Sequence, residues 1–238
     1  MSLFNTEANR INEKSARYLV VTDDGSHTIF HPESDQHYHS THGALQESKH
    51  VYLEAGFNYL AEKFDYITIF EMGFGTGLNA LLIANEAWNK KIRVVYSTCE
   101  LYPLEEEIYT NLNYPQFIDP AQASVWLTKM HKVPWDEQAH RIHPYFSIIK
   151  HHRSIDEMVF KEETIRLIFF DAFAPSFQPQ QWSECIFRRI KEALLPGSVL
   201  VTFATNGTVK NGLRKNGFDV SRLQGPKGKH EMLRALYY

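Results

Sequence analysis

Short apolar segments alternate with longer amphipathic ones through most of this 238-residue chain, which limits the folds open to it. Five apolar runs have the length and the β-branched or aromatic content of strands: YITIF, IRVVYSTC, YFSIIK, IRLIFF and SVLVTFA. Segments with helical periodicity separate most of them, at 78–88, 103–112 and 178–195. Strands that alternate with helices predict a mostly parallel sheet with helices on both faces.

The first 60 residues carry a different pattern. Two apolar runs flank Asp24-Gly25, a dipeptide that favours a tight turn, so we expect a β-hairpin there. A helix is expected from Ala44, because apolar residues recur on one face: Leu45, Val51, Tyr52 and Phe57. We interpret residues 1–60 as an N-terminal extension, made of this hairpin and helix, of a single domain at 61–238.

The C-terminal segments complete the expected sheet. Residues 208–217 predict a helix, and the strand-like segments 218–223 and 231–238 have only a loop between them, so we expect them to pair antiparallel at one edge. The region 115–143 has no clear period and is interpreted as an irregular insertion with short helices. The expected fold is α/β, with a mostly parallel seven-stranded sheet and an antiparallel last strand.

Composition narrows the class of protein. Hydrophobic residues make up 43% of the chain, enough for a large core, and no apolar run reaches the roughly eighteen residues of a membrane span. The N-terminus is polar and mixed in charge, unlike a secretory signal, so we expect a cytoplasmic protein. Cys99 and Cys185 are interpreted as reduced core thiols. The histidines lack cysteines or carboxylates at ligand spacing, so no metal site is expected.

A glycine-rich turn follows the first apolar run, in the stretch EMGFGTG. Glu71 precedes Gly73, Gly75 and Gly77, and a helical segment follows. The dinucleotide fingerprint G-x-G-x-x-G would need its third glycine at position 78, which is Leu78, so the chain does not carry it. A carboxylate beside the loop would repel a pyrophosphate and stabilise an ammonium or sulfonium group. S-adenosylmethionine carries both cations and is the expected cofactor.

A second carboxylate, Glu100, follows the next strand-like run. Nucleotide-binding sheets place at that point the acid that bonds ribose hydroxyls. The pattern E-x-G-x-G-x-G with a later acid is typical of class I, Rossmann-like S-adenosylmethionine-dependent methyltransferases. The alternative is that Glu71 and Glu100 are ordinary surface carboxylates at strand ends.

Asp171 ends the run IRLIFF, which should lie next to the glycine-loop strand. A carboxylate there can accept a hydrogen bond from an amine and help to remove its proton, so an amine acceptor is predicted. Phe173 and Trp182 could stack on a flat base, in a loop stiffened by Pro175 and Pro179. The alternatives are that Asp171 only caps the strand and that the two aromatic residues are core.

The C-terminal tail has a charge of its own. Residues 206–238 contain seven basic and two acidic residues, although the formal net charge of the whole chain is −3. Such a tail is either a solvated face or a contact for phosphate.

Three stretches, FEMGFGTGLNALL, DAFAPSFQPQQW and FATNGTVKNGLRKNGF with the later GPKGKHEML, resemble the methyltransferase half of the bifunctional MnmC proteins, called MnmD when it stands alone. The upstream stretch YHSTHGALQESKHVYLEAGF resembles the same family, so the likeness runs roughly from Tyr18 to the C-terminus. The resemblance implies methyl transfer from S-adenosyl-L-methionine to the exocyclic amine of 5-aminomethyl-2-thiouridine. The substrate would be the wobble uridine in the anticodon loop of tRNA, and the product 5-methylaminomethyl-2-thiouridine.

The resemblance also implies roles for the residues that match its motifs. Asp171 would be the catalytic residue, at the acceptor amine. The implied cofactor-binding residues are Gln46, Glu47, Ser48, Glu71, Gly73, Gly75, Gly77 and Glu100, and we expect Phe74, Asn79, Leu101 and His152, from their places beside them, to bind the cofactor as well. The implied substrate-binding residues are Phe173, Pro175, Trp182, Lys227, Lys229 and Glu231.

Two features depart from the family pattern. Bifunctional members continue into an FAD-dependent oxidase that prepares the amine, whereas this sequence ends at Tyr238; we therefore expect no FAD and a separate enzyme that supplies the aminomethyl group. After YFSIIK, many methyltransferases carry an aspartate that bonds the adenine amino group. Here His152 takes that place, and the nearest acid is Asp156.

Two other functions fit the residues. One is a methyltransferase or aminopropyltransferase that acts on a small-molecule amine, since such enzymes share the sheet and the acidic crevice. The other is a non-catalytic tRNA-binding protein with a vestigial cofactor site. The sequence specifies neither the oligomeric state nor which tRNAs are bound.

Overall fold

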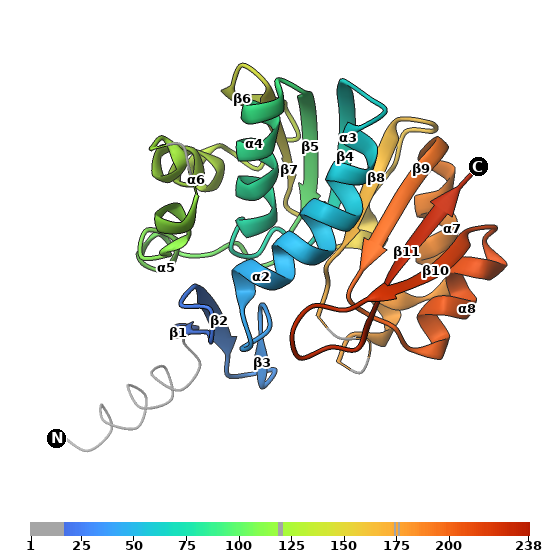
Figure 1. The fold of residues 1–238 in the computed structure, drawn as a ribbon, viewed down its shortest axis with the longest axis horizontal. Helices are drawn as coiled ribbons and strands as arrows, with labels where there is room; N and C mark the ends of the chain where they lie inside the picture. The colour runs from blue at the N-terminus through green and yellow to red at the C-terminus, as the bar shows by residue number, and fades with distance from the viewer. Residues whose placement is uncertain (1–16, 119–120, 174, 176) are drawn as a thin grey trace, which may run out of the picture.

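The computed structural model describes residues 17–118, 121–173, 175 and 177–238 (Figure 1). Residues 1–16 of the expected extension lie outside this part of the chain. One large sheet has the strand order β10-β11-β9-β8-β4-β5-β7-β6. Its strands are β4 (Tyr66–Met72), β5 (Arg93–Cys99), β6 (His140–His143), β7 (Phe146–His151), β8 (Ile165–Phe170), β9 (Leu194–Thr202), β10 (Asp219–Gln224) and β11 (Glu231–Tyr237). The pairs formed among β7, β5, β4, β8 and β9 are parallel, as the alternation predicted.

The predicted count of seven strands is wrong, because β6 adds an eighth to the described sheet. It pairs antiparallel with β7 at the sheet edge, with a register shift between Arg141 and His143. Its sequence, HRIH, contains one apolar residue and no alternation, so its pattern did not indicate a strand. Short helices also occupy this region, as expected: η2 (Tyr114–Phe117) and α6 (Ala123–Lys132).

The two ends of the sheet differ in how well the sequence predicted them. The antiparallel pair of β10 and β11 is confirmed, and β11 lies between β10 and β9. The helix expected at 178–195 is shorter: η4 (Pro179–Trp182) is a 3₁₀ turn and α7 spans Glu184–Glu192. The last apolar residues of that segment instead open β9, which contains Pro196 and Gly197. The pairing of β8 with β9 skips this part of β9, because proline has no amide donor for the ladder.

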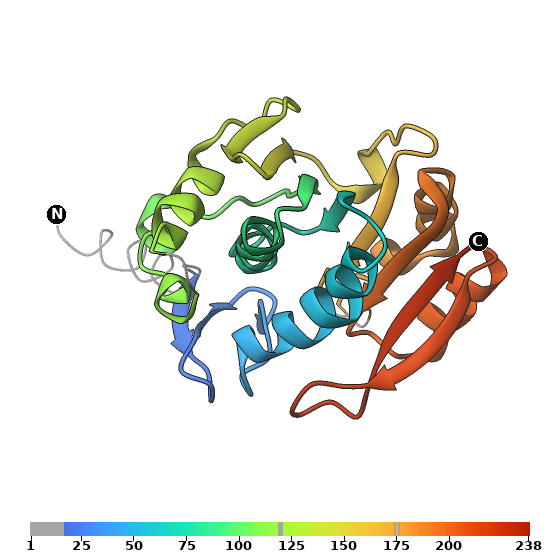
Figure 2. The ribbon, with the colours of Figure 1, turned by 45° about the horizontal axis from the view of Figure 1, so that its top comes forward.

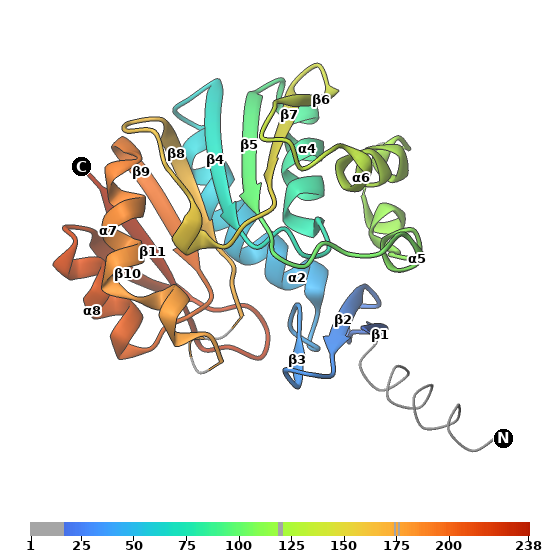
Figure 3. The same cartoon turned by 180° about the vertical axis from the view of Figure 1, so that it is seen from behind.

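Helices cover both faces of the large sheet. α2 (Ala44–Ser48), the π-helical η1 (Lys49–Asn58), α3 (Tyr59–Ala61) and α4 (Leu78–Lys90) lie on one face, and α7 and α8 (Gly207–Lys215) lie on the other (Figures 1 and 3). Side chains along β8 alternate accordingly. Leu167 and Phe169 pack in the core with η1 and α4, whereas Ile168 and Phe170 pack in the core with α7. Two shorter helices, α5 (Glu106–Tyr109) and η3 (Ile155–Glu157), follow β5 and β7.

The N-terminal segment forms a separate small sheet and then crosses the large one. The predicted hairpin is confirmed, since β1 (Tyr18–Val21) pairs antiparallel with β2 (His27–His31), and β2 also pairs with β3 (Gln36–His37). η1 then runs across β8 and β9 (Figure 2). Gly56 permits this contact, because a Cβ there would lie 3.1 Å from the side chains of both Phe169 and Val201.

Two further expectations concern the cysteines and membranes. Both cysteines are free, but only Cys99 is buried; Cys185 is exposed on α7, so its assignment to the core is wrong. α7 is amphipathic, and a single residue of intermediate polarity does not reveal which side of it faces water. Among the residues described, we find no helix with the length and apolar content needed to cross a membrane.

Candidate functional site

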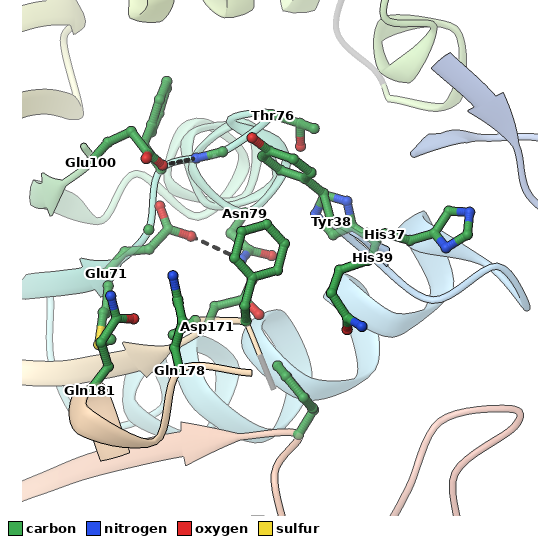
Figure 4. Close-up of a pocket in the computed structure, with 18 of the residues that line it drawn as sticks. His37, Tyr38, His39, Glu71, Thr76, Asn79, Glu100, Asp171, Gln178 and Gln181 are labelled. Carbon is green, nitrogen blue, oxygen red and sulfur yellow. Dashed lines mark hydrogen bonds between the residues drawn. The ribbon is translucent and has the colours of Figure 1, made fainter. Parts of the chain in front are cut away.

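A cavity of about 450 Å³ opens at the carboxyl ends of β4, β5 and β8 (Figure 4). Its walls come from residues 35–41 with Glu47, from the loops after β4, β5, β7 and β8, and from Phe203 and Lys229 near the C-terminus. Ligands of open parallel sheets bind at this edge, and a cavity of this size can hold a nucleoside.

The glycine loop between β4 and α4 forms one wall of the cavity. Gly73, Gly75 and Gly77 have φ angles of 88°, 49° and 73°, which residues with a side chain rarely adopt. A Cβ on Gly73 would lie 3.1 Å from the carbonyl oxygen of Asp171, so this glycine lets the loop pack against the end of β8. Phe74 also lines the cavity. The loop has the geometry that close approach of a ligand to the backbone requires.

Glu71, in β4, is only 1% exposed and lines the cavity. Its Oε1 accepts a hydrogen bond of 2.9 Å from the side-chain amide of Asn79 on α4. Its Oε2 is buried and accepts no well-formed hydrogen bond from the described residues, but the buried Tyr96 hydroxyl lies near enough to the carboxyl to lower its pKa. Burial, and after it the charge of Asp171, raises the pKa of Glu71 well above its usual range. A cation in the cavity would favour the charged form of this carboxylate.

Glu100 follows β5 and holds the glycine loop from the other side. Its Oε2 accepts a hydrogen bond of 3.1 Å from the backbone N–H of Gly75, and its Oε1 accepts one of 2.9 Å from that of Tyr102. Glu100 and Leu101 both line the cavity. Each carboxylate oxygen retains a lone pair, so the side chain can also accept bonds from ligand hydroxyls.

Asp171 lies directly after β8, close to Asn79 and Glu71 in Figure 4. Asn79 donates a hydrogen bond of 2.7 Å to its Oδ2, and the Tyr52 hydroxyl donates one of 2.6 Å to its Oδ1. Burial raises the pKa of Asp171 to about 6, and the hydrogen bond from Tyr52 opposes this rise. Asp171 is therefore mostly ionised at neutral pH, yet close to the range in which it can hold a proton.

Several residues in the cavity wall or directly behind it had not been anticipated. Tyr52 was expected only as a core residue, although a tyrosine on a buried helix face needs a partner for its hydroxyl and so gave a signal. His39, in a segment expected to be a loop, lines the cavity; burial lowers its pKa to about 4, so it is neutral there. Gln178 and Gln181 line the cavity on the side of Glu71 (Figure 4).

The aromatic residues after β8 divide between cavity and core. Phe173 lines the cavity, and its ring meets that of Tyr38 edge-on at 5.4 Å between centroids. Trp182 is buried against Phe170, at 4.6 Å, and its Nε1 donates a hydrogen bond of 3.0 Å to the Phe173 carbonyl. Trp182 thus supports the loop from beneath. Pro175 is not among the lining residues.

The upstream segment and the tail meet at one ion pair. Glu47 and Lys229 both line the cavity, and the Lys229 ammonium pairs with the Glu47 carboxylate. Gln46 and Lys227 lie outside, on a second, open groove. Ser48 is fully buried and does not line either hollow. In the tail, Glu231 pairs with Arg222 on the surface, at 3.2 Å.

The side of the cavity after β7 is formed by Arg153, Ser154 and Ile155. His152 is not among the lining residues; its Nε2 lies 3.1 Å from the carbonyl oxygen of Leu101. Asp156 is likewise absent from the wall. Within the described ranges, no three histidine, cysteine, aspartate or glutamate side chains are grouped so that they could hold a metal ion.

A family profile of S-adenosyl-L-methionine-dependent methyltransferases matches residues 120–238, half of the chain. The chain belongs to this methyltransferase family. The matched half includes Asp171 and the basic tail.

Curated relatives extend the likeness to the glycine-loop half of this methyltransferase. The "tRNA 5-methylaminomethyl-2-thiouridine biosynthesis bifunctional protein MnmC" of Azoarcus sp. (strain BH72) is 31% identical over 215 residues, which cover 84% of this chain and 32% of the relative. The protein of the same name from Magnetococcus marinus is 31% identical over 218 residues, covering 88% of this chain and 32% of the relative. The chain therefore spans about a third of the length of these relatives.

Among solved structures, the methyltransferase is similar to MNMC2 from Aquifex aeolicus, with a TM-score of 0.76 and 24% sequence identity. The match covers 99% of this chain and 78% of that chain. At this identity the likeness concerns the fold, which confirms the predicted Rossmann-like methyltransferase architecture.

The cavity of this methyltransferase fits S-adenosyl-L-methionine, the cofactor of its family. The buried Oε2 of Glu71 accepts no well-formed hydrogen bond, and a cation in the cavity would stabilise its negative charge. At Gly73 the glycine loop lies too close to the Asp171 carbonyl for a side chain. The carboxylate oxygens of Glu100 are hydrogen-bond acceptors at the edge of the cavity. The cavity therefore offers negative charge for the two cationic groups of the cofactor and hydrogen-bond acceptors for its ribose hydroxyls.

Proposed function

We propose that this methyltransferase transfers a methyl group from S-adenosyl-L-methionine to the primary amine of 5-aminomethyl-2-thiouridine, forming 5-methylaminomethyl-2-thiouridine. The acceptor is the wobble uridine in the anticodon loop of a tRNA, and the reaction takes place in the cytoplasm. The names of the curated relatives support this substrate. The observation that carries the proposal is the Asp171 carboxylate, held by two donors in the cavity that the glycine loop also lines.

The proposed cofactor contacts come from the glycine-loop half of the cavity. Glu71 faces the cationic part of the cofactor and Glu100 its ribose hydroxyls. Arg153, Ser154 and Ile155 take the adenine side, with His152 behind them. The further contacts that we assign to the cofactor are Glu47, Gly73, Phe74, Gly75, Gly77, Asn79 and Leu101.

Asp171 is the proposed catalytic residue. S-adenosyl-L-methionine supplies a methyl group on a positively charged sulfur, which only a neutral amine can attack. An alkyl amine is mostly protonated at neutral pH, so it must lose a proton first. Asp171 accepts a hydrogen bond from the ammonium group, takes up its proton on a carboxylate oxygen and so presents the free amine. Its pKa of about 6 allows it to be ionised before this step and to hold a proton during it.

The acceptor base is held on the side of the cavity formed by the loop after β8. We assign the stacking contact to Phe173, whose ring lines the cavity, with Pro175 and Trp182 fixing the loop. Lys227 lies on the second, open groove outside the cavity, where it can contact a phosphate. Lys229 is engaged by Glu47 and acts as part of the wall.

Transfer of labelled methyl groups to defined acceptors tests the proposal. We expect label from S-adenosyl-L-methionine to appear in 5-methylaminomethyl-2-thiouridine when the tRNA carries 5-aminomethyl-2-thiouridine, measured by mass spectrometry of the digested nucleosides. A tRNA that already carries the methylated base should stay unlabelled. Label in free polyamines but not in tRNA would identify a small-molecule methyltransferase instead. Tight tRNA binding without transfer would identify a non-catalytic binding protein.

A further inference from the structure

Tyr52 approaches Asp171 from outside the cavity. It lies on η1, a π-helical segment, and π-helical turns occur often at functional sites. Its side chain is 1% exposed, and its ring packs against Phe169 of β8 at 5.1 Å between centroids. The ring is not among the cavity-lining residues, so only the hydroxyl reaches the site, through its 2.6 Å bond to Asp171 Oδ1.

The two oxygens of Asp171 are held from two different elements. Tyr52 binds Oδ1 from η1, and Asn79 binds Oδ2 from α4. A carboxylate held at both oxygens cannot rotate freely, and each oxygen keeps a lone pair for the substrate. The rigid packing of both donors therefore fixes the direction in which Asp171 accepts a hydrogen bond.

The surroundings of Asp171 would otherwise favour its neutral form. Burial and the charge of Glu47 raise its pKa, and the hydrogen bonds from Tyr52 and Asn79, with the charge of Lys229, lower it. The Glu71 carboxylate, joined to Asp171 through Asn79, is the remaining acidic neighbour. Tyr52 is the donor that can be removed cleanly, because Asn79 also holds Glu71.

We propose that Tyr52 is a positioning residue for methyl transfer, whose hydroxyl keeps the Asp171 carboxylate ionised and aimed at the acceptor amine. This inference rests on the proposed function, since it assigns to Asp171 the task of accepting the amine proton. Tyr52 itself touches neither cofactor nor acceptor. Its contribution should appear mainly in the rate and its pH dependence, with only a small change in the affinity for S-adenosyl-L-methionine.

The variant Tyr52→Phe tests this by removing one hydroxyl and keeping the ring. In single-turnover methyl transfer we expect a rate reduced about tenfold at neutral pH, as for loss of a hydrogen bond to a charged group. The acid limb of the pH profile should move up by roughly one pH unit, because the pKa of Asp171 rises when its donor is lost. The control is Tyr114→Phe, which loses a partly buried bond of 2.7 Å to the His27 carbonyl but does not bond Asp171, and so should leave the acid limb unmoved.

A second variant guards against misfolding. Tyr52→3-fluorotyrosine retains the hydroxyl and makes it a stronger donor, so the acid limb should move down. Equal profiles for wild type, Tyr52→Phe and Tyr52→3-fluorotyrosine, or shifts in the same direction for both variants, would overturn the inference while the proposed function stands.

Calorimetry separates this inference from the proposed function. Titration of the protein with S-adenosyl-L-methionine, in two buffers of different ionisation enthalpy, counts the protons released on binding. We expect Tyr52→Phe to release more protons than wild type near pH 7, because more of its Asp171 is protonated before the cation binds. If wild type methylates no aminomethylated tRNA, the proposed function fails, and the proton count alone then tests whether Tyr52 keeps Asp171 ionised. Equal proton counts for wild type and Tyr52→Phe would overturn the inference.

Discussion

The two halves of the cavity are built in different ways. The cofactor half consists of Glu71, the glycine loop and Glu100, which lie at the ends of two neighbouring parallel strands. The acceptor half brings Asp171 together with Tyr52, 119 residues earlier in the chain, and with Lys229 of the tail, whose charge lowers the pKa of Asp171. One half depends on local motifs, and the other on contacts that only the complete fold creates.

This difference indicates that one half of the cavity determines cofactor binding and the other determines transfer to the acceptor. The cofactor half can be recognised in any chain with the same strand ends, since it requires only a carboxylate, a backbone loop and a second carboxylate. In the acceptor half, the N-terminal extension and the tail close around Asp171. We therefore expect substitutions in the first half to change cofactor affinity and those in the second to change transfer.

The largest effect is expected for Asp171→Asn. The amide cannot accept a proton from the amine, so transfer to aminomethylated tRNA should fall by roughly 10²- to 10⁴-fold. Binding of S-adenosyl-L-methionine, measured by calorimetry, should stay within about threefold of wild type. Loss of cofactor binding together with transfer would place Asp171 in the cofactor half and remove the distinction.

Glu100→Ala should have the opposite effects: weaker cofactor binding and a nearly unchanged rate of transfer. Removal of the ribose acceptor, which also holds the glycine loop at Gly75, should weaken cofactor affinity by about 10- to 100-fold. At saturating cofactor, the rate of transfer to tRNA should approach that of wild type. A fall in the saturated rate without any change in cofactor affinity would contradict the role assigned to Glu100.

The pH dependence of folding tests the burial of Asp171 without any ligand. Its pKa of about 6 lies above the value of an unfolded chain, so the folded protein holds a proton that the unfolded chain releases. The stabilisation is complete below about pH 4 and is lost as the pH rises through about 6. Relative to Asp171→Asn, the free energy of unfolding of wild type should fall by up to about 1.4 kcal/mol per pH unit in this window. Urea unfolding series measure the difference, and a constant difference would show that Asp171 is not buried in solution.

The smallest effects concern the two lysines of the tail. Lys227→Ala removes a charge from the second, open groove and should weaken tRNA binding severalfold at low salt, with a reduced salt dependence. Lys229→Ala leaves the buried Glu47 unpaired, so its loss of transfer should persist at high salt. Filter binding and transfer assays at two salt concentrations separate these outcomes. Identical salt behaviour of both variants would mean that the two lysines act alike.

Much of the fold was predictable because strands buried on both faces have a distinctive pattern, as in IRLIFF of β8. β6 and the start of β9 were not, since HRIH has no period and Pro196 usually excludes a strand. In the site, the motif around Glu71 predicted Gly73 and Gly75 as residues that line the cavity with it, whereas Gly77 caps α4. The contact of Tyr52 with Asp171 was not predictable, because no local pattern joins a helix to the end of a strand so distant in the chain.

The most direct test of the central claim, that the two halves join at Asp171 to methylate an amine, is one single-turnover experiment. Wild type and Asp171→Asn, both saturated with methyl-labelled S-adenosyl-L-methionine, are mixed with tRNA that carries 5-aminomethyl-2-thiouridine. We predict rapid formation of labelled 5-methylaminomethyl-2-thiouridine by wild type and almost none by the variant. An unchanged nucleoside with wild type, or equal rates for the two proteins, would contradict the account.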